Sequence, residues 1–245
     1  MTVFIELAGP AGSGKTTLAE LLSHELTGVS LLLVDASTNR QLTRRMTLEL
    51  FDNAYGNSLE SVLSNLSEST LASGNGLPPK NEAIDWAFHD LPFMVGDNLD
   101  LIPCGPGFDL TLPELAQKML AYGFPRLCAD YDVVVLDGFH PALHGLLPAD
   151  ALQVLVSLPD VTVSPLPALS KNEPGTFMKN PGLSLIINRY QRGSLSPVLE
   201  ELIRNNTVSL IGKIPHYDTP AEREDAMPEA FRNCLLRLDI PLLKR

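Results

Sequence analysis

Cysteine is scarce in this chain, and the three that are present lie far apart, at Cys104, Cys128 and Cys234. No C-x-C or C-x-x-C spacing occurs, so the cysteines offer no recognisable metal site. A sparse and odd cysteine count suits a reducing compartment, and we expect a cytoplasmic protein.

Long apolar runs and basic residues are also in short supply. No run approaches the roughly 20 residues that span a bilayer, and the N-terminus leads directly into a predicted strand, so we expect neither a membrane span nor a signal peptide. Only 18 Lys and Arg stand against 29 Asp and Glu, which gives a net charge of −11. A polyanion repels a polyanion, so we expect no non-specific nucleic-acid binding. The dense basic stretch at 40–45 is interpreted as a solvated helix face.

A glycine-rich motif at 9–16 is the strongest signal that is present. The letters G-P-A-G-S-G-K-T match G-x-x-x-x-G-K-T, the phosphate loop of nucleoside triphosphatases. Glycines let the backbone wrap around phosphates, Lys15 places a cation on the β- and γ-phosphates, and the Thr16 hydroxyl binds Mg²⁺. A predicted strand at 3–8 and a predicted helix at 17–26 supply the required context. The predicted nucleotide-binding residues of the loop are Gly9, Gly12, Ser13, Gly14, Lys15, Thr16 and Thr17.

Two predicted buried strands end in an acid. The apolar run at 29–34 ends at Asp35, and the run at 131–136 ends at Asp137. A carboxylate at the carboxyl edge of a sheet is well placed to hold a magnesium-bound water, as the acid of a Walker B element does. For Asp35, a turn-forming role is an equally weighted alternative. The predicted catalytic residues are Lys15, Asp35 and Asp137, and the predicted metal-binding residues are Thr16, Asp35 and Asp137.

The remaining pattern alternates between strands and helices. Further strands are predicted at 98–102, 153–158, 183–187 and 207–212. Helices are predicted through Leu48 and Phe51, at 58–66, at 81–88, and from a Thr111 cap to about Tyr122. This alternation favours an α/β fold, a doubly wound and mostly parallel sheet with helices on both faces. Length and a hydrophobic content of 44% suit one domain over 1–245.

The order of these motifs resembles the ParA/MinD-type ATPases of the SIMIBI class of P-loop proteins. The phosphate loop, Asp35, Asp137 and the segments Ile-Ile-Asn-Arg at 186–189 and Ile-Gly-Lys-Ile-Pro at 211–215 carry the resemblance. The stretches 35–39 and 214–218 look most like CooC-type members. The resemblance implies ATP and Mg²⁺ as cofactors, adenine recognition by Asn188, and a base pocket completed near Pro215. It further implies a nucleotide-dependent homodimer that docks a protein partner.

The chain departs from that family at three points. The extra lysine of the family's phosphate loop is replaced by Pro10, the second acid after the second strand is replaced by Ser37, and the C-x-C of CooC-type proteins is absent. Transition-state groups of the first two kinds are worth roughly 10²-fold in rate. We therefore expect an ATP-dependent switch with slow or partner-stimulated hydrolysis, and ATP is favoured over GTP because no N-K-x-D occurs.

Two other functions fit the sequence. The first is a small-molecule kinase, because a phosphate loop without the extra lysine is found in many P-loop kinases and Asp137-Gly-Phe-His resembles uridine-kinase-like enzymes. In that case Asp137 activates the acceptor, and Arg40, Arg44 and Arg45 form a lid. The second is a nucleotide-binding module that has lost hydrolysis, as the Pro10 and Ser37 replacements indicate.

Two weaker signals lie outside these motifs. Phe231, Leu235 and Leu238 share one face of a predicted C-terminal helix. MinD-type proteins bind membranes through such a helix, although packing against the sheet is the favoured interpretation. His140 and His144 have the spacing of a helical metal pair, but Pro141 favours surface-loop histidines instead.

Overall fold

The computed structural model of the chain describes residues 2–37, 40–47, 58–72, 79–105, 112–160 and 183–238. The chain divides into two compact units, one made of Met1–Phe4 and Gly28–Ala149, the other of Ile5–Thr27 and Asp150–Arg245. The prediction of one domain over 1–245 stays a prediction.

The strands form a mostly parallel sheet, which confirms the predicted α/β class. They follow the order β3-β4-β2-β5-β1-β6-β7-β8. Every strand pair with a described register is parallel except β3–β4, which is antiparallel. The strands are β1 (Val3–Ala8), β2 (Leu31–Asp35), β3 (Phe93–Gly96), β4 (Leu99–Pro103), β5 (Val133–Asp137), β6 (Leu152–Ser157), β7 (Leu183–Tyr190) and β8 (Ser209–Pro215).

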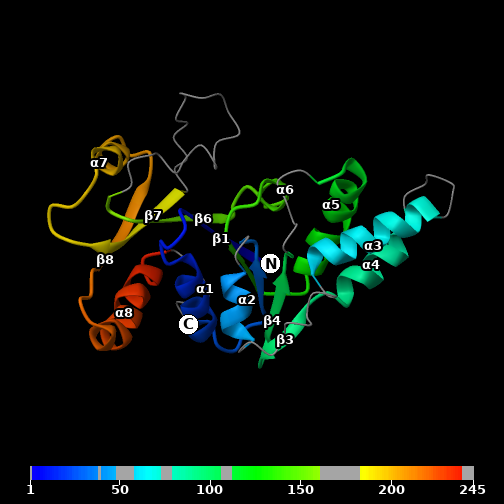
Figure 1. Ribbon diagram of the computed structural model, residues 1–245, viewed down its shortest axis with the longest axis horizontal. Helices are drawn as coiled ribbons and strands as arrows, with labels where there is room; N and C mark the ends of the chain where they lie inside the picture. The colour runs from blue at the N-terminus through cyan, green and yellow to red at the C-terminus, as the bar shows by residue number, and fades with distance from the viewer. Residues whose placement is uncertain are drawn as a thin grey trace. The chain divides into compact units, whose positions relative to one another are not determined.

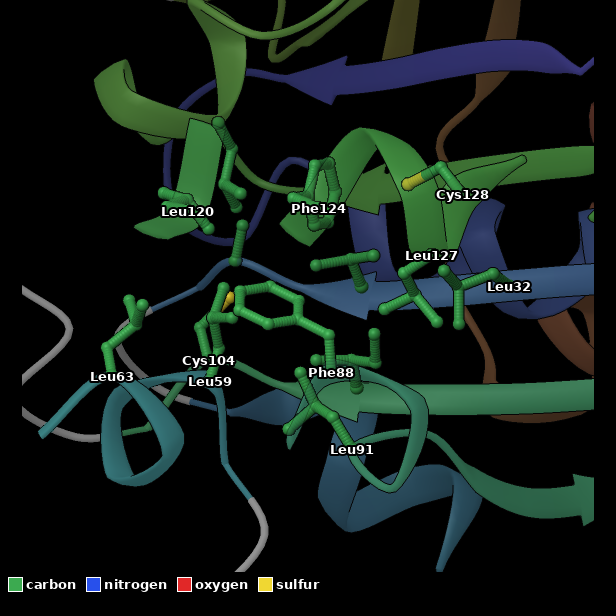
Figure 2. Close-up of a cluster of buried hydrophobic side chains, with 14 of the residues drawn as sticks. Leu32, Leu59, Leu63, Phe88, Leu91, Cys104, Leu120, Phe124, Leu127 and Cys128 are labelled. Atoms are coloured by element: carbon green, nitrogen blue, oxygen red, sulfur yellow. The ribbon is translucent and has the colours of Figure 1, made fainter. Parts of the chain in front are cut away.

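The helices of the first unit are α2 (Gln41–Met46), α3 (Leu59–Ala72), α4 (Asn81–His89), α5 (Glu114–Cys128) and α6 (Pro141–His144) (Figure 1). Helices α3 to α6 contribute side chains to one large apolar core. Figure 2 shows Phe88 of α4 and Phe124 of α5 in the same cluster as Leu32 of β2. A Cβ at Gly123 would lie 2.5 Å from the Phe88 ring, so a glycine is what allows α4 to approach α5 this closely. Burial of such side chains stabilises the unit by about 2 kcal/mol each.

The second unit contains α1 (Lys15–Glu25), α7 (Pro197–Arg204) and α8 (Pro220–Leu235). Helix α8 packs against β8 and α1 (Figure 1). Phe231 and Leu235 of α8 are 0% and 1% exposed, and Leu238, which follows the helix, is 3% exposed, so the apolar face of the C-terminal helix faces the interior of its unit. The burial of this face agrees with the expected packing against the sheet rather than with membrane binding by the helix. In the described part of the chain, no helix is long and apolar enough to cross a membrane.

The structure differs from the sequence prediction at several elements. Strand β3 was not predicted, because it is four residues long and none of its side chains is buried. Helix α5 continues to Cys128, past Pro125, where the pattern predicted an end near Tyr122. The predicted helical positions Leu48 and Phe51 and the Thr111 cap lie outside the described residues.

Candidate functional site: a phosphate loop and two strand-end acids

The phosphate loop adopts a backbone that requires glycine. Gly9, Gly12 and Gly14 have φ values of 144°, 75° and 100°, which side-chain-bearing residues rarely adopt. A Cβ at Gly9 would also clash with the carbonyl oxygen of Val156 in β6. From the sequence, we expected the glycines to let the backbone wrap around phosphates. The positive φ values of the three glycines are of the kind that such a loop needs.

Helix α1 begins at Lys15, directly after Gly14. Its N-cap residue is Gly14, which has no side chain to cap the helix, and its first turn contains no acidic residue. The N-terminus of a helix carries a partial positive charge and outward N–H groups, so an anion is stabilised there. The local electrostatics therefore favour a phosphate at this end of the helix.

Lys15 folds back over the loop. Its Nζ donates hydrogen bonds to the carbonyl oxygens of Gly9 and Pro10, at 2.9 and 2.8 Å. The ammonium group thus lies over the start of the loop. Thr16, the predicted magnesium ligand, is buried, and Thr17 is half-buried beside it.

Ser13 lies in the middle of the loop and is 0% exposed. Its Oγ is a buried polar atom with no hydrogen-bond partner among the described residues. A buried hydroxyl without a partner costs about 1–3 kcal/mol. An oxygen-rich ligand in the loop would remove that cost, so the residues present fit a phosphate group.

Asn188 and Pro215, the residues expected near the base, come from the ends of neighbouring strands. Asn188 of β7 is 7% exposed and its Nδ2 donates a hydrogen bond of 2.8 Å to the Ser13 carbonyl oxygen. Pro215 ends β8, is exposed, and stands in register with Tyr190 of β7. The structure therefore brings Asn188 to the phosphate loop itself.

The carboxylate of Asp35 is buried and accepts hydrogen bonds on both oxygens. Oδ1 accepts from the Ser37 N–H at 3.3 Å and the Ser37 hydroxyl at 2.6 Å. Oδ2 accepts from the Thr43 N–H at 2.8 Å and the Thr43 hydroxyl at 2.7 Å. The side chain of Arg40, the N-cap residue of α2, makes no capping hydrogen bond. Asp35, which precedes the helix by several residues, instead accepts a hydrogen bond from the N–H of Thr43 in its first turn.

Asp137 stands directly opposite Asp35 in the register of β5 and β2, and it is also fully buried. Gly138 follows with a φ of 113°, and a Cβ there would lie 3.2 Å from the backbone of Ala36 and Ser37. The first unit thus brings the two predicted acids together.

The thiol of Cys104 is buried near Asp35. Burial raises the pKa of this thiol well above its ordinary value, and the negative charge of Asp35 raises it further.

His140 and His144 bracket the short helix α6. The Nδ1 of His140 accepts a hydrogen bond from the Ala142 N–H at 3.3 Å, so His140 caps the helix, and Pro141 takes the first helical position. The described residues contain no group of three or more His, Cys, Asp or Glu that could hold a metal ion.

Sequence reasoning missed two features of the first unit. One is Thr43, which lies inside the basic stretch at 40–45 and gave no signal of its contact with Asp35. The other is a pocket of about 510 Å³ lined by residues of α4 and α5, including Phe88, Gly123 and Trp86. Trp86 is 70% exposed there. The contact between α4 and α5 has no signature in the sequence.

Comparison with known proteins supports the fold rather than a particular activity. No protein-family model and no curated protein matches the chain. A plasmid partition protein from Borrelia burgdorferi bound to AMPPNP matches with a TM-score of 0.65 and 18% identity over 100% of both chains. A chain of the MinC:MinD cell division complex of Aquifex aeolicus matches with a TM-score of 0.56 and 18% identity over 96% of both chains.

A third match extends this fold to another activity. Cobyrinic acid a,c-diamide synthase from Mycobacterium smegmatis, with a bound ATP analogue and magnesium, matches with a TM-score of 0.60 and 19% identity, over 96% of this chain and 95% of that one. The chain has the fold of the ParA- and MinD-type P-loop ATPases, as the order of its motifs predicted.

Proposed function

We propose that this protein binds ATP with Mg²⁺ and acts as a nucleotide-dependent switch with slow or partner-stimulated hydrolysis. The observation that carries the proposal is the phosphate loop of the second unit, with three glycines at positive φ and with Lys15 at the start of helix α1, whose N-cap is Gly14. Solved proteins of the same fold include one bound to AMPPNP and one bound to an ATP analogue and magnesium. Both observations favour a nucleoside triphosphate over other anions.

The proposed roles follow the chemistry of the residues. Backbone N–H groups of the loop and the N-terminus of α1 hold the phosphates, and Lys15, which lies over the Gly9 and Pro10 carbonyl oxygens, neutralises charge on the phosphate oxygens. Thr16 is the proposed magnesium ligand, and Asp35 and Asp137 act on magnesium or its waters. Asn188 and the chain near Pro215 are the proposed contacts on the base side.

Slow turnover is proposed because two groups that accelerate hydrolysis are replaced. Pro10 occupies the place of the family's extra lysine, and Ser37 that of the second acid. The Ser37 hydroxyl is hydrogen-bonded to Asp35, and its weakly basic oxygen lacks the negative charge that orients an attacking water. Each replacement is expected to lower the rate by roughly 10²-fold. A partner protein or a second copy of the chain is the proposed source of the missing groups.

The test follows phosphate release and molecular mass together, in purified protein with Mg·ATP or Mg·ADP. The proposal predicts dimers with ATP but not with ADP, and slow phosphate release. Lys15→Ala, which removes the cation of the phosphate loop, is the matched control. It is expected to remain a monomer with Mg·ATP and with Mg·ADP. A high basal turnover in the isolated monomer would contradict the switch. Phosphate transfer to an added small-molecule acceptor, with none released in its absence, would establish the kinase alternative instead.

A further inference from the structure

The side chain of Asn188 contacts the backbone of the phosphate loop directly. Its Nδ2 donates a 2.8 Å hydrogen bond to the carbonyl oxygen of Ser13, which lies 175 positions away in the sequence. A Cβ at Gly14 would lie 2.5 Å from the same nitrogen, so the amide group rests on the loop at residues 13 and 14. With 7% of its surface exposed, Asn188 is a buried side chain.

The opposite end of the Asn188 amide is fixed as well. Its Oδ1 accepts a hydrogen bond of 2.9 Å from the N–H of Arg189. Arg189 itself has a φ of 57°, in the left-handed region that residues with a side chain rarely adopt. The two hydrogen bonds together fix the orientation of the Asn188 amide.

The loop benefits from such support because glycine is conformationally permissive. A segment with glycine at 9, 12 and 14 has many accessible backbone conformations, so contacts from outside the loop help to select the observed one. Ser13 lies between Gly12 and Gly14, both at positive φ, and its carbonyl oxygen is the point that Asn188 holds. The contact between Asn188 and Ser13 is called the Asn188–Ser13 bridge below.

We infer that Asn188 is a positioning residue that holds the phosphate loop in its binding shape through the Asn188–Ser13 bridge. The inference rests on the proposed function, since it assumes that the loop binds phosphates. If Asn188 holds the loop, its loss weakens the binding of every polyphosphate ligand, with or without a base. A residue that only reads adenine would have no effect on a ligand without a base.

Calorimetric titration with Mg·ATP and with magnesium tripolyphosphate, which carries no base, separates the two roles. Asn188→Ala is expected to weaken tripolyphosphate binding by about fivefold, because one hydrogen bond is lost from the loop, and to weaken ATP binding by at least as much. Asn205→Ala, at an exposed asparagine of the same unit, is the control and is expected to change neither. Weaker ATP binding with unchanged tripolyphosphate binding overturns the inference, and so does no change for either ligand.

Hydrogen exchange without any ligand gives a second and independent readout. Asn188→Asp has nearly the same shape and keeps the acceptor for the Arg189 N–H, but it replaces the donor to Ser13 with an oxygen. The inference predicts faster exchange of the amides at 13–16 in this variant, with unchanged exchange in the strands β6 and β8. Equal exchange in both proteins overturns it. If the wild-type protein binds neither ligand, the proposed function fails, and the exchange experiment still decides whether Asn188 shapes the loop.

Discussion

The phosphate loop depends on its backbone conformation, whereas the strand end at Asp35, opposite Asp137, depends on side-chain hydrogen bonds. In the loop, the decisive features are the backbone angles of Gly9, Gly12 and Gly14, which a residue without a side chain adopts most readily. At the strand ends, side chains decide: Asp35 accepts four hydrogen bonds from Ser37 and Thr43. Changes to the loop should therefore act through backbone strain, and changes at Asp35 through hydrogen bonds.

Gly9→Ala is expected to have the largest effect on stability. Alanine at a φ of 144° is strained, and its Cβ would clash with the Val156 carbonyl oxygen, so we predict a loss of about 3 kcal/mol in the free energy of unfolding. Gly12→Ala is the matched control, because its φ of 75° is also strained but nothing lies within 4 Å of its Cβ. We predict about 1 kcal/mol for this control, measured by urea denaturation. Equal losses in the two variants would contradict the role of close backbone approach.

Asp35→Ala removes the acceptor for Ser37 and Thr43 at once. Because the donors are left without their partner at a buried position, we predict a loss of about 2 kcal/mol in the free energy of unfolding. Hydrogen exchange of the Thr43 amide should also accelerate, since Asp35 supports the first turn of α2. Stability within 0.5 kcal/mol of wild type, about the scatter of surface substitutions, would show that the network does not support this unit.

Thr43→Val tests one member of the same network with little change in shape. It removes the hydroxyl that donates to Asp35 at 2.7 Å, and we predict a loss of about 1 kcal/mol. In combination with Asp35→Ala, the two losses should be less than additive, because both variants break the same hydrogen bond. Thr27→Val, at an exposed threonine, is the control and should change stability by less than about 0.5 kcal/mol. Full additivity would indicate that Thr43 acts independently of Asp35.

The pH dependence of stability gives the smallest predicted effect. The pKa of the Cys104 thiol is raised by burial and by Asp35, so the folded state keeps a proton that the unfolded state releases above its ordinary pKa of about 8.5. The stabilisation is therefore fully present at neutral pH and is lost as the pH rises above that value. Urea denaturation from pH 7 to 10 should show a shallower decline in Cys104→Ala than in wild type. Identical slopes would contradict a raised thiol pKa.

The sequence predicted the loop better than the strand ends, for a physical reason. The glycines at 9, 12 and 14 are required by local backbone geometry, so their spacing alone indicates the structure. The partners of Asp35 depend on how α2 follows β2, and the Asn188–Ser13 bridge joins residues 175 positions apart. Such contacts leave no local pattern. The edge strand β3 was missed because Met94, 79% exposed, gives it no buried alternation.

The central claim is that a preformed phosphate loop binds a nucleoside triphosphate. It is tested most directly by calorimetric titration of Mg·ATP into the wild-type protein and into Lys15→Ala. Lys15 supplies charge-assisted hydrogen bonds worth about 2–3 kcal/mol, so the account predicts saturable binding to wild type and affinity weaker by roughly 30- to 150-fold in the variant. Equal affinities, or no heat of binding in the wild-type protein, would contradict it.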